Sequence, residues 1–501
     1  MKLKTIVIGS GPSGISVTSA LLGNGYHVTM LDVGKKLEEN ILYIKNKLKL
    51  IDPTKWSNEF ASFKTMDFSK DSNLSPKRKF GSVFPYYIDK EIFTGSSNYR
   101  FYGSEAYGGL SNVWGCALLE PILSELQDWP NLVTEGIKNS NIHVKELINS
   151  VTSSDYYNEI NDLKISNAAL TLLKNNINNK ISNINLFKTP LAINKNCKNC
   201  NMCMYGCVYD YTYSSNQTIE NSFFNNINFL YLNNHKVLSV EEINGKVNVI
   251  SLNNGKEQLF IVDKVFIAAG MLATLKILWN SNIPIPNKLL ASDSSYGIIP
   301  SLFFKNFKEN EHHGLSHLSI DFFDKPFDKF SFHGQLYFNN PAVNEGLFAI
   351  VKKLHLSFLK PFVNILSKYL VIGQVYLNSV HSNKISLEKI DNQKINISVK
   401  NSDTKYLKYA SSIYKKRMKE IGLFPIIFLS KYYPQGASKF GGALPHADIH
   451  EIHNTDLIGR PYGCKNIHVV DSTVLPSLPA RNHSFLIMCN AYRIGIDACK
   501  V

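Results

Sequence analysis

Four of the eight cysteines in this 501-residue chain lie in one short stretch, CKNCNMCMYGC. Cys197, Cys200, Cys203 and Cys207 have the spacing C-x2-C-x2-C-x3-C, which is that of bacterial ferredoxins, where thiolates hold a cubane iron–sulfur cluster. Zinc sites usually place two C-x2-C pairs well apart along the chain, and disulfides need an oxidising compartment. The spacing favours a 4Fe-4S or 3Fe-4S cluster, and zinc, disulfides and unligated thiols stay open as alternatives.

The end of this stretch departs from the ferredoxin pattern. Val208 follows the fourth cysteine, where ferredoxins have proline, and the fourth cysteine there often serves a different cluster. We therefore expect three local ligands, with either Cys207 or the distant Cys116 completing the site.

A second group of residues is suited to holding phosphate. Gly9, Gly11 and Gly14 give G-x-G-x-x-G between a short apolar strand and an apolar-periodic helix. These glycines permit a tight turn, close approach of a pyrophosphate and close packing of helix on strand. Ser13 lies at the N-terminus of the helix, whose partial positive charge holds phosphates. Asp32 ends the next strand, where its carboxylate can accept hydrogen bonds from the ribose hydroxyls. The segment predicts a dinucleotide-binding βαβ unit.

The rest of the chain favours FAD over NAD in that unit. Residues 235–270 read as strands joined at Asn-Gly turns, and they end in an apolar strand and Gly270. Such a strand returns to the nucleotide sheet, so Val237 and Gly270 are expected to lie against the cofactor. No second G-x-G-x-x-G unit appears in the sequence, and a single nucleotide site that must do redox chemistry fits a flavin best.

Composition bounds the partners and the compartment. The net charge is +14, but only six of the 54 basic residues are arginine, so we expect no nucleic-acid partner. The N-terminus enters a strand and a glycine turn without a secretory cleavage site, which predicts a cytoplasmic protein. Residues 347–373 combine lysines on one arc with Phe, Leu, Ile and Val elsewhere, the pattern of a helix lying on an anionic membrane. The alternatives are a candidate peripheral contact with the inner membrane face and a helix pair, broken at Pro361, packed on the core.

Four segments resemble the glucose–methanol–choline oxidoreductase family. They are the glycine fingerprint above, YGGLSNVWGCALLEP at 107–121, FIAAGMLATLKIL at 266–278, and the C-terminal signature at 455–495. The second is closest to the version in pyranose 2-oxidases. The cysteine-rich segment resembles the cluster loop of the α subunit of bacterial FAD-dependent glucose dehydrogenases.

The resemblance implies roles for particular residues. Asp471 is expected to bind the ribityl or phosphate region of the flavin, and Gly108, Gly109, Ser111 and Asn112 are expected to line the flavin and its pyrophosphate. Val113 stands where pyranose 2-oxidases carry the histidine that attaches the flavin, so the flavin is expected to be non-covalent.

The resemblance also implies where the catalytic residues lie. Asn482 falls where the family has one of two catalytic residues, behind the isoalloxazine, and His483 follows it. Lys439 stands where the family has its catalytic histidine. Lysine has an unperturbed pKa near ~10.4, so it can act as a base only if burial lowers that pKa. The base is therefore His483, Lys439 or His446, or the alcohol chemistry is altered or lost. Gln335 and Tyr337 are expected to contact substrate from a strand above the flavin.

These observations predict a mixed α/β fold: a discontinuous FAD-binding Rossmann-like domain with an inserted antiparallel-sheet substrate domain. The expected FAD domain comprises 1–121, 190–300 (with the cysteine insertion 197–207) and 446–501, with a helical insertion at 122–189 and the substrate domain at 301–445.

The expected activity is oxidation of the CH–OH group of a sugar or other alcohol. Hydride passes to flavin N5, and electrons pass through the cluster to an external acceptor such as a quinone or cytochrome. The alternatives are an oxygen-using oxidase of the same family, a redox-neutral flavoenzyme (isomerase or dehydratase) and a non-catalytic flavin- or metal-binding protein.

Overall fold

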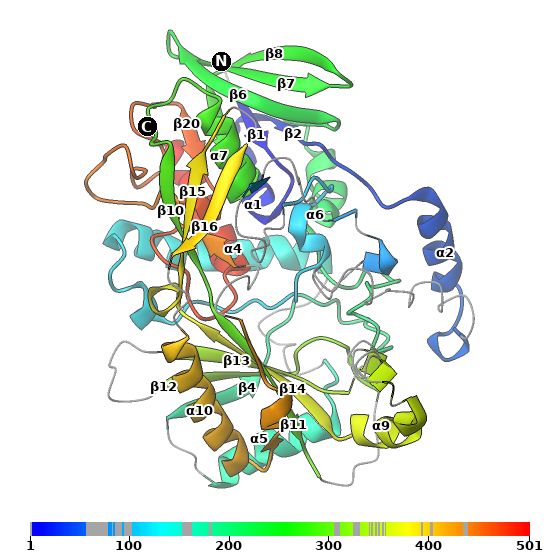
Figure 1. The fold of residues 1–501 in the computed structure, drawn as a ribbon. Coiled ribbons are helices and arrows are strands. Elements are labelled where there is room, and N and C mark those ends of the chain that lie inside the picture. Colours follow the sequence, from blue (N-terminus) through cyan, green and yellow to red (C-terminus); the bar gives the residue numbers. More distant parts are fainter. Residues whose placement is uncertain are drawn as a thin grey trace.

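The computed structural model places a nucleotide-binding domain above a second domain built on an antiparallel sheet (Figure 1). The described residues are 3–56, 79–82, 84–85, 93–94, 103–152, 163–179, 183–304, 311–323, 331–339, 357–391, 394–400, 404–433 and 439–501, with a few single positions between 341 and 355. Both termini lie in the upper domain, so the two ends of the chain build one unit, as the sequence predicts (Figure 1).

The upper domain is organised around a parallel sheet of the strand order β20-β9-β1-β2-β5. The bounds of these strands are β1 (Lys4–Ile8), β2 (His27–Leu31), β5 (Phe229–Leu232), β9 (Lys264–Ile267) and β20 (Ile467–Val469). Ile6, Val7 and Ile8 are all buried, which is the continuous apolar run expected of a strand covered on both faces. The predicted strand–helix–strand unit is therefore present, with α1 (Pro12–Gly23) as its helix.

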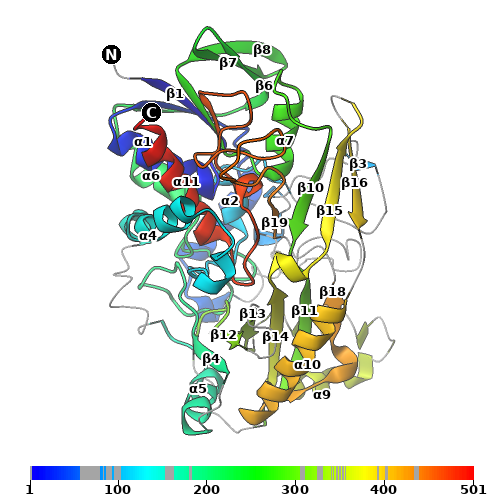
Figure 2. The same cartoon turned by 90° about the vertical axis from the view of Figure 1, so that its left-hand side faces the viewer.

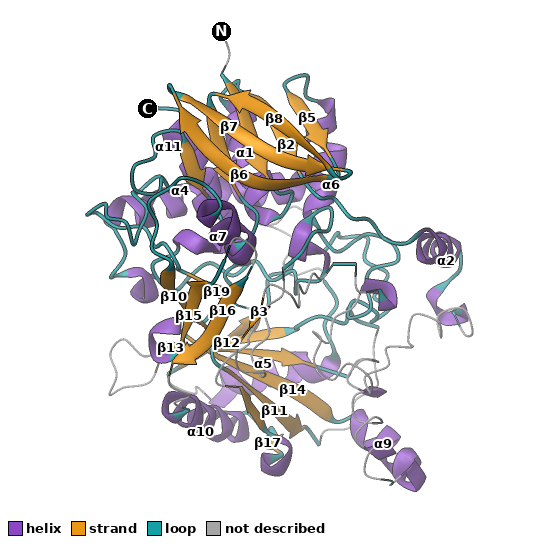
Figure 3. Cartoon of the chain, turned by 45° about the horizontal axis from the view of Figure 1, so that its top comes forward, coloured by secondary structure: helices purple, strands orange, loops and turns teal. Residues whose placement is uncertain are grey.

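The C-terminal helix and the N-terminal helix pack against each other beside this sheet (Figure 2). A Cβ atom on Gly495 of α11 (Ser484–Ala498) would lie 2.7 Å from the Cβ of Ala20, so the two helices approach too closely for a larger side chain. α4 (Asn131–Thr152) packs on α11, and a separate antiparallel sheet of β6 (His235–Ile243), β7 (Lys246–Asn253) and β8 (Lys256–Val262) lies at the top of the domain (Figure 3).

The lower domain contains the predicted antiparallel sheet, with the order β17-β11-β14-β13-β12-β4 and β18 paired to β11. Its strands are β4 (Ile184–Lys188), β11 (Tyr296–Leu302), β12 (Leu318–Phe323), β13 (Ser331–Tyr337), β14 (Leu370–Leu377), β17 (Phe424–Pro425) and β18 (Lys431–Tyr433). One face of this sheet is apolar: Phe322, Phe332 and Val375 pack with Tyr414 of α10 (Lys405–Glu420) in one core cluster. Since side chains alternate along a strand, the other face carries the intervening polar residues.

The two expected insertions are partly described. Residues 122–189 contain α4 and α5 (Asn167–Asn179), but β4 joins the lower sheet. A further sheet of the order β19-β10-β15-β16-β3 lies beside both domains, with β10 (Lys288–Asp293), β15 (Lys384–Lys389), β16 (Ile395–Lys400), β3 (Phe93–Thr94) and β19 (Phe440–Gly441). The predicted fold class is confirmed: a parallel-sheet nucleotide domain with separate antiparallel sheets.

Within the described residues, the last part of the segment 347–373 is a strand and not a helix. Its described residues include α9 (Lys360–Ser367), and the chain then enters β14 at Leu370. Pro361 lies in the first turn of α9, where its missing N–H costs no helical hydrogen bond. Most of 341–356 lies outside the described residues. Among the helices that are described, none is long and apolar enough to cross a membrane.

Candidate functional site

The glycine turn after β1 leaves space where a pyrophosphate would lie. Gly9 has φ +101°, and a Cβ atom there would lie 2.7 Å from the carbonyl oxygen of Ala268. A Cβ atom on Gly14 would lie 2.0 Å from the carbonyl oxygen of Gly9, so helix and strand pack as closely as a glycine allows. A Cβ atom on Gly11 would meet nothing within 4 Å. The backbone at Gly11 is thus open, and it faces the N-terminus of α1, as a phosphate site requires.

The loop after residue 103 packs on this turn. Gly109 lies in the left-handed region, and a Cβ atom there would be 3.1 Å from the Cα of Gly11. The Gly108 N–H donates to Ser10 Oγ at 2.8 Å, and Ser10 in turn donates to Asp32. The loop predicted to line the flavin therefore contacts the dinucleotide fingerprint.

Two polar side chains predicted to line the flavin also shape this loop. The Ser111 hydroxyl donates to the carbonyl of Gly108 at 2.5 Å and accepts the Ser215 N–H at 2.8 Å. The Asn112 amide donates to the carbonyls of Tyr107 and Gly109, each at 2.9 Å. These bonds fix the loop above the N-terminus of α1.

Asp32 lies buried at the carboxyl end of β2. Its Oδ2 atom accepts hydrogen bonds from the hydroxyls of Ser10 and Tyr231, and the distance to the Tyr231 oxygen is 3.1 Å. Burial raises the pKa of this carboxyl to about 7, and the hydrogen bonds it accepts act in the opposite direction. The carboxyl lies where open parallel sheets bind nucleotides, outside the carboxyl ends of the strands. β6 begins beside it, with the His235 N–H bonded to the Asp32 carbonyl at 2.9 Å, so Val237 follows closely on this edge.

Asp471 joins the ends of two parallel strands. Its carboxylate accepts hydrogen bonds from the Gly270 N–H at 2.8 Å and from the Thr274 hydroxyl at 2.5 Å, and both residues follow β9 in the chain. The same carboxylate accepts the backbone N–H of Thr473 at 2.9 Å and that residue's hydroxyl. The carboxylate thus positions the loop at the sheet edge. Because its oxygens are used by protein groups, a cofactor at this position would contact the backbone of the loop. Gly270 leads into α7 (Met271–Trp279).

Lys439, one of the three predicted candidate bases, is buried between the two domains. Its Nζ donates to the Ala480 carbonyl at 2.9 Å and lies 3.7 Å from the ring centroid of Tyr376. Burial lowers the pKa of this amine to about 7, although the charges of Glu125 and Asp293 favour the protonated form. Lysine at this position therefore exists partly as a neutral amine at pH 7, which is the condition for proton acceptance.

The predicted pair Asn482–His483 lies next to Lys439 along the Ala480 segment, immediately before α11. The Asn482 Oδ1 atom is buried and has no hydrogen-bond partner among the described residues. Burial, together with the positive charge of Lys439, lowers the pKa of His483 to about 3. Both candidate bases therefore face one region.

The structure adds a buried histidine–carboxylate pair that the sequence analysis missed. His333 on β13 is paired in register with Asp321 on β12, and the distance from Nδ1 to Oδ1 is 2.9 Å. Both side chains are fully buried. The Nε2 atom of His333 is buried and, among the described residues, has no hydrogen-bond partner. Arg481 completes the group, donating from Nε to Asp321 Oδ1 at 3.0 Å and from a second nitrogen to Oδ2.

The hydrogen bonds within this group shift the pKa values of Asp321 and His333. Burial alone would raise the pKa of Asp321, but the hydrogen bonds from His333 and Arg481 lower it to about 2. Burial lowers the pKa of His333; its bond to Asp321 raises that pKa, and the charges of Lys439 and Arg481 lower it. An ionised Asp321 holds the proton on Nδ1, so Nε2 carries the free lone pair. The tautomer follows from this hydrogen bond.

The polar face of the lower sheet brings further groups to the same region. His333 is paired in register with Tyr376, and Gln335 with Gln374. Burial and the nearby Cys116 thiol raise the pKa of Tyr337, which links this strand to the end of the flavin loop. Tyr337 also donates to Gln335 at 3.2 Å. Alternation along FHGQLY had pointed to Gln335 and Tyr337, and His333 lies on the same face one alternate position earlier.

His446, the third candidate base, is engaged on both ring nitrogens. Its Nδ1 lies 2.7 Å from the carbonyl oxygen of Asp456, and its Nε2 lies 3.2 Å from nitrogens of Asn490 and Arg493. Burial lowers its pKa to about 3, and the charge of Arg493 acts in the same direction. Its geometry is that of a buried support for the C-terminal helix.

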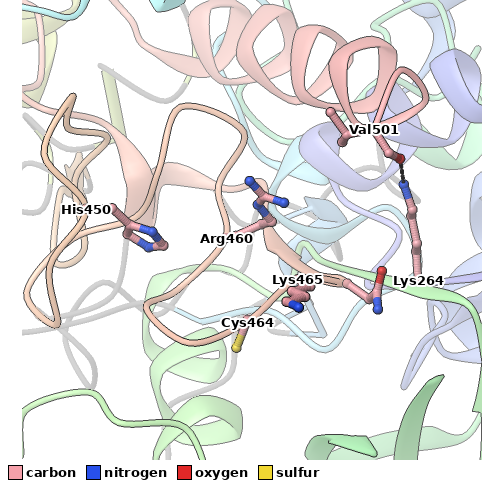
Figure 4. Close-up of a pocket in the computed structure, with 7 residues that line it drawn as sticks. Lys264, His450, Arg460, Cys464, Lys465 and Val501 are labelled. Atoms are coloured by element: carbon pink, nitrogen blue, oxygen red, sulfur yellow. Dashed lines mark hydrogen bonds between the residues drawn. The ribbon is translucent and has the colours of Figure 1, made fainter. Parts of the chain in front are cut away.

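A surface pocket of about 400 Å³ lies apart from these groups (Figure 4). It is lined by Lys264, His450, Arg460, Cys464, Lys465, Asn466 and Val501. Lys264 begins β9, so the pocket lies at the amino edge of the parallel sheet. Nucleotides bind at the opposite edge, and this pocket is not part of the candidate site.

The predicted metal site is not supported. Within the described residues, which include all four clustered cysteines, no group of three or more His, Cys, Asp or Glu side chains is arranged to hold a metal ion. Cys203 accepts the Gly314 N–H at 3.4 Å and Cys207 accepts the Tyr211 N–H at 3.2 Å, while burial raises the pKa of all four thiols. The four thiols lie in one loop, but within the described residues they are not arranged as the ligands of a metal ion.

Comparison with known proteins was made by sequence and by structure. No protein-family model and no curated protein sequence matches this chain. Among solved structures, pyridoxine 4-oxidase from Mesorbium loti superposes with a TM-score of 0.63 over 99% of this chain and 99% of that chain, at 11% identity. A likeness at this identity shows the fold alone. The shared fold runs over the whole chain: a parallel-sheet domain with an inserted antiparallel-sheet domain, as the sequence predicts.

Proposed function

We propose that this protein is an FAD-dependent oxidoreductase that acts on the CH–OH group of a small alcohol or sugar. The observation that carries the proposal is the group formed by the Asp321–His333 pair and Lys439 next to Asn482–His483. The charge of Lys439 acts on the His333 ring, and the Lys439 amine is bonded to the Ala480 carbonyl in the segment that leads into α11. The full-length likeness in fold to pyridoxine 4-oxidase supports an oxidoreductase.

The residues of the upper domain fit a flavin dinucleotide. The open backbone at Gly11 and the N-terminus of α1 would bind the pyrophosphate, Asp32 would bind the ribose, and the loop at Gly108–Asn112 would cover the cofactor. When bound, FAD supplies the acceptor for the hydride that leaves the substrate carbon. Val113 lacks a nucleophilic atom, so we expect the flavin to be released on denaturation.

The residues of the lower sheet would handle the proton. His333 Nε2 would accept the hydroxyl proton of the substrate, because Asp321 keeps the other ring nitrogen protonated and stabilises the resulting imidazolium. Lys439 would donate a hydrogen bond to the alkoxide oxygen as it forms. Asn482 Oδ1, without a partner in the described residues, would orient the substrate hydroxyl.

The electron acceptor is the finer part of the proposal. An external carrier, such as a quinone or cytochrome, is supported only by the resemblance of the cysteine-rich segment to the cluster loop of FAD-dependent glucose dehydrogenases. Among the described residues, no group of side chains arranged to hold a metal ion adds to that support. The alternative is direct reaction with oxygen, which the name of pyridoxine 4-oxidase indicates for that protein.

The test is binding followed by turnover. The purified chain is titrated with FAD and, in parallel, with NAD, and the loaded protein is then assayed with alcohols and sugars, using either oxygen or a dye as acceptor. We expect tight binding of FAD alone and alcohol-dependent dye reduction that exceeds oxygen consumption. Retention of NAD in place of FAD would overturn the cofactor, and hydrogen peroxide as the main product would overturn the carrier.

A further inference from the structure

Large apolar side chains are concentrated on one end of the lower domain. The exposed members are Phe304, Phe358, Phe362, Ile365, Phe424, Ile427 and Phe428, which we call the apolar end. They come from three separate segments of the chain, and this end lies opposite the β6–β8 sheet of the upper domain (Figures 1 and 2). Scattered exposed apolar residues are normal, but a contiguous group of phenylalanines marks an interaction surface.

One stripe of this surface runs along α9. Phe362 and Ile365 are three residues apart on α9, so they share one face, and Phe358 lies in the preceding turn η6 (Ser357–Leu359). The exposed fractions of Phe358, Phe362 and Ile365 are 74%, 61% and 60%. Val363 and Ser367 are buried on the opposite face. The helix is thus held to the protein by one side while an apolar stripe faces solvent.

The stripe continues onto the edge of the sheet. The ring centroid of Phe304 is 6.1 Å from that of Tyr369, which follows α9, and 5.7 Å from that of Phe424 on β17. β17 pairs with β11, and the next turn, η8 (Ile427–Leu429), exposes Ile427 by 66% and Phe428 by 85%. Ring contacts and strand pairing therefore join the segments into one surface.

The segments that form the apolar end are strongly basic. Residues 346–387 contain no Asp or Glu, and residues 404–433 contain six lysines and one arginine against a single acid, Glu420. That acid is paired with Arg417 at 3.0 Å. Lys360 and Lys368 of the α9 region, Lys416 and Lys419 of α10, and Lys431 of β18 are exposed.

We propose that the apolar end docks on an anionic lipid surface. Phenylalanines at the tips and a rim of lysines are the composition of a segment that lies in the headgroup region of a bilayer. A second copy of this chain is a poorer occupant, because a symmetric interface would bring two lysine-rich faces together. Docking would leave the nucleotide domain in water at the other end of the molecule. The inference does not depend on the proposed chemistry.

The test is flotation of the purified full-length chain with vesicles of phosphatidylcholine alone or of phosphatidylcholine with phosphatidylserine. We expect co-flotation with the anionic vesicles only, weakened by salt. The double variant Phe362→Ser, Phe428→Ser should bind about tenfold more weakly, because apolar burial is lost. Lys360→Glu with Lys368→Glu should weaken binding at least about thirtyfold, because each positive charge lost near the surface costs about 1 kcal/mol and each added Glu is repelled by the anionic lipid.

Matched controls change the same residue types elsewhere. Leu259 and Ile261 are exposed by 58% and 59% on β8, and Lys256 is exposed on the same strand. Their replacement by Ser, Ser and Glu should leave vesicle binding unchanged, while sedimentation shows a monomer for every variant. The proposal is overturned if the wild-type chain stays unbound on anionic vesicles, or if the apolar-end variants float like the wild type. A dimer that only those variants dissociate would also overturn it and assign the surface to a second copy.

Discussion

Asp321, His333 and Arg481 come from two distant parts of the chain, yet they form one hydrogen-bonded group. Arg481 also donates to the Glu120 carbonyl at 2.6 Å, so this side chain connects the lower sheet to the end of the segment 107–121. A buried carboxylate is costly unless paired, and here it has two charge-assisted partners. The group is therefore suited to hold a histidine in one tautomer at a fixed position.

Asp321→Asn tests that role. The amide cannot stabilise the imidazolium, so we expect the rate of flavin reduction by substrate to fall by about 10²–10⁴-fold while the affinity for FAD stays unchanged. His333→Gln should have a similar effect. His235→Gln is the matched control, since His235 is also buried and bonded, to Ser251 at 3.0 Å, but lies on β6. Equal rates in all three variants would exclude the pair from the chemistry.

The lowered pKa of Lys439 makes the free energy of unfolding depend on pH in a definite direction. Its folded-state pKa is about 7 against a usual value of 10.5, so the unfolded chain binds more protons between these values, and stability rises with pH over that window. Lys439→Met should therefore raise the free energy of unfolding at pH 7 by on the order of 3 kcal/mol and remove the slope. Urea denaturation at pH 7 and pH 9 measures both. An unchanged slope would mean that the amine keeps its ordinary pKa.

At the scale of elements, the glycines between β1 and α1 have two different roles. The fold requires Gly14, and ligand binding requires Gly11. A Cβ on Gly14 collides with backbone, whereas one on Gly11 meets nothing. We expect Gly11→Ala to keep the melting temperature of the apoprotein and to lose most of its affinity for FAD, measured by fluorescence titration. Gly23→Ala, at the open C-terminal end of α1, is the control and should retain FAD binding. Normal FAD affinity in Gly11→Ala would place the pyrophosphate elsewhere.

Sequence patterns predicted these elements unequally well. The strand–turn–helix at residues 4–23 has a short-range signal, because glycine spacing and apolar period lie within one segment. His333 was missed because its partner lies on another strand and Arg481 is far along the chain, so only strand register brings them together. The cysteine spacing predicted a ligand shell that the loop does not form. The pattern of residues 347–373 predicts a helix, or a helix pair broken at Pro361, but pairing with β11 and β13 makes 370–377 a strand.

At the scale of the whole molecule, acid should destabilise the fold. Burial lowers the pKa of His313 and His483 to about 3 and that of His468 to about 4, so these rings are neutral when folded. Their contribution is complete above the unfolded value of ~6.5 and is lost progressively as pH falls from there towards 4. We expect the free energy of unfolding, from urea titration, to drop by several kcal/mol between pH 7 and pH 4.5. Constant stability over this range would show that these histidines ionise in the folded state.

The proposed function requires that hydride passes from an alcohol carbon to a flavin bound by this chain. The most direct measurement is the absorbance of the FAD-loaded protein mixed, without oxygen, with a panel of sugars, polyols and other small alcohols. We predict that at least one substrate bleaches the oxidised flavin, and that the loss slows sharply in His333→Gln but not in His235→Gln. Bound FAD that stays oxidised with every member of the panel would contradict the proposed function.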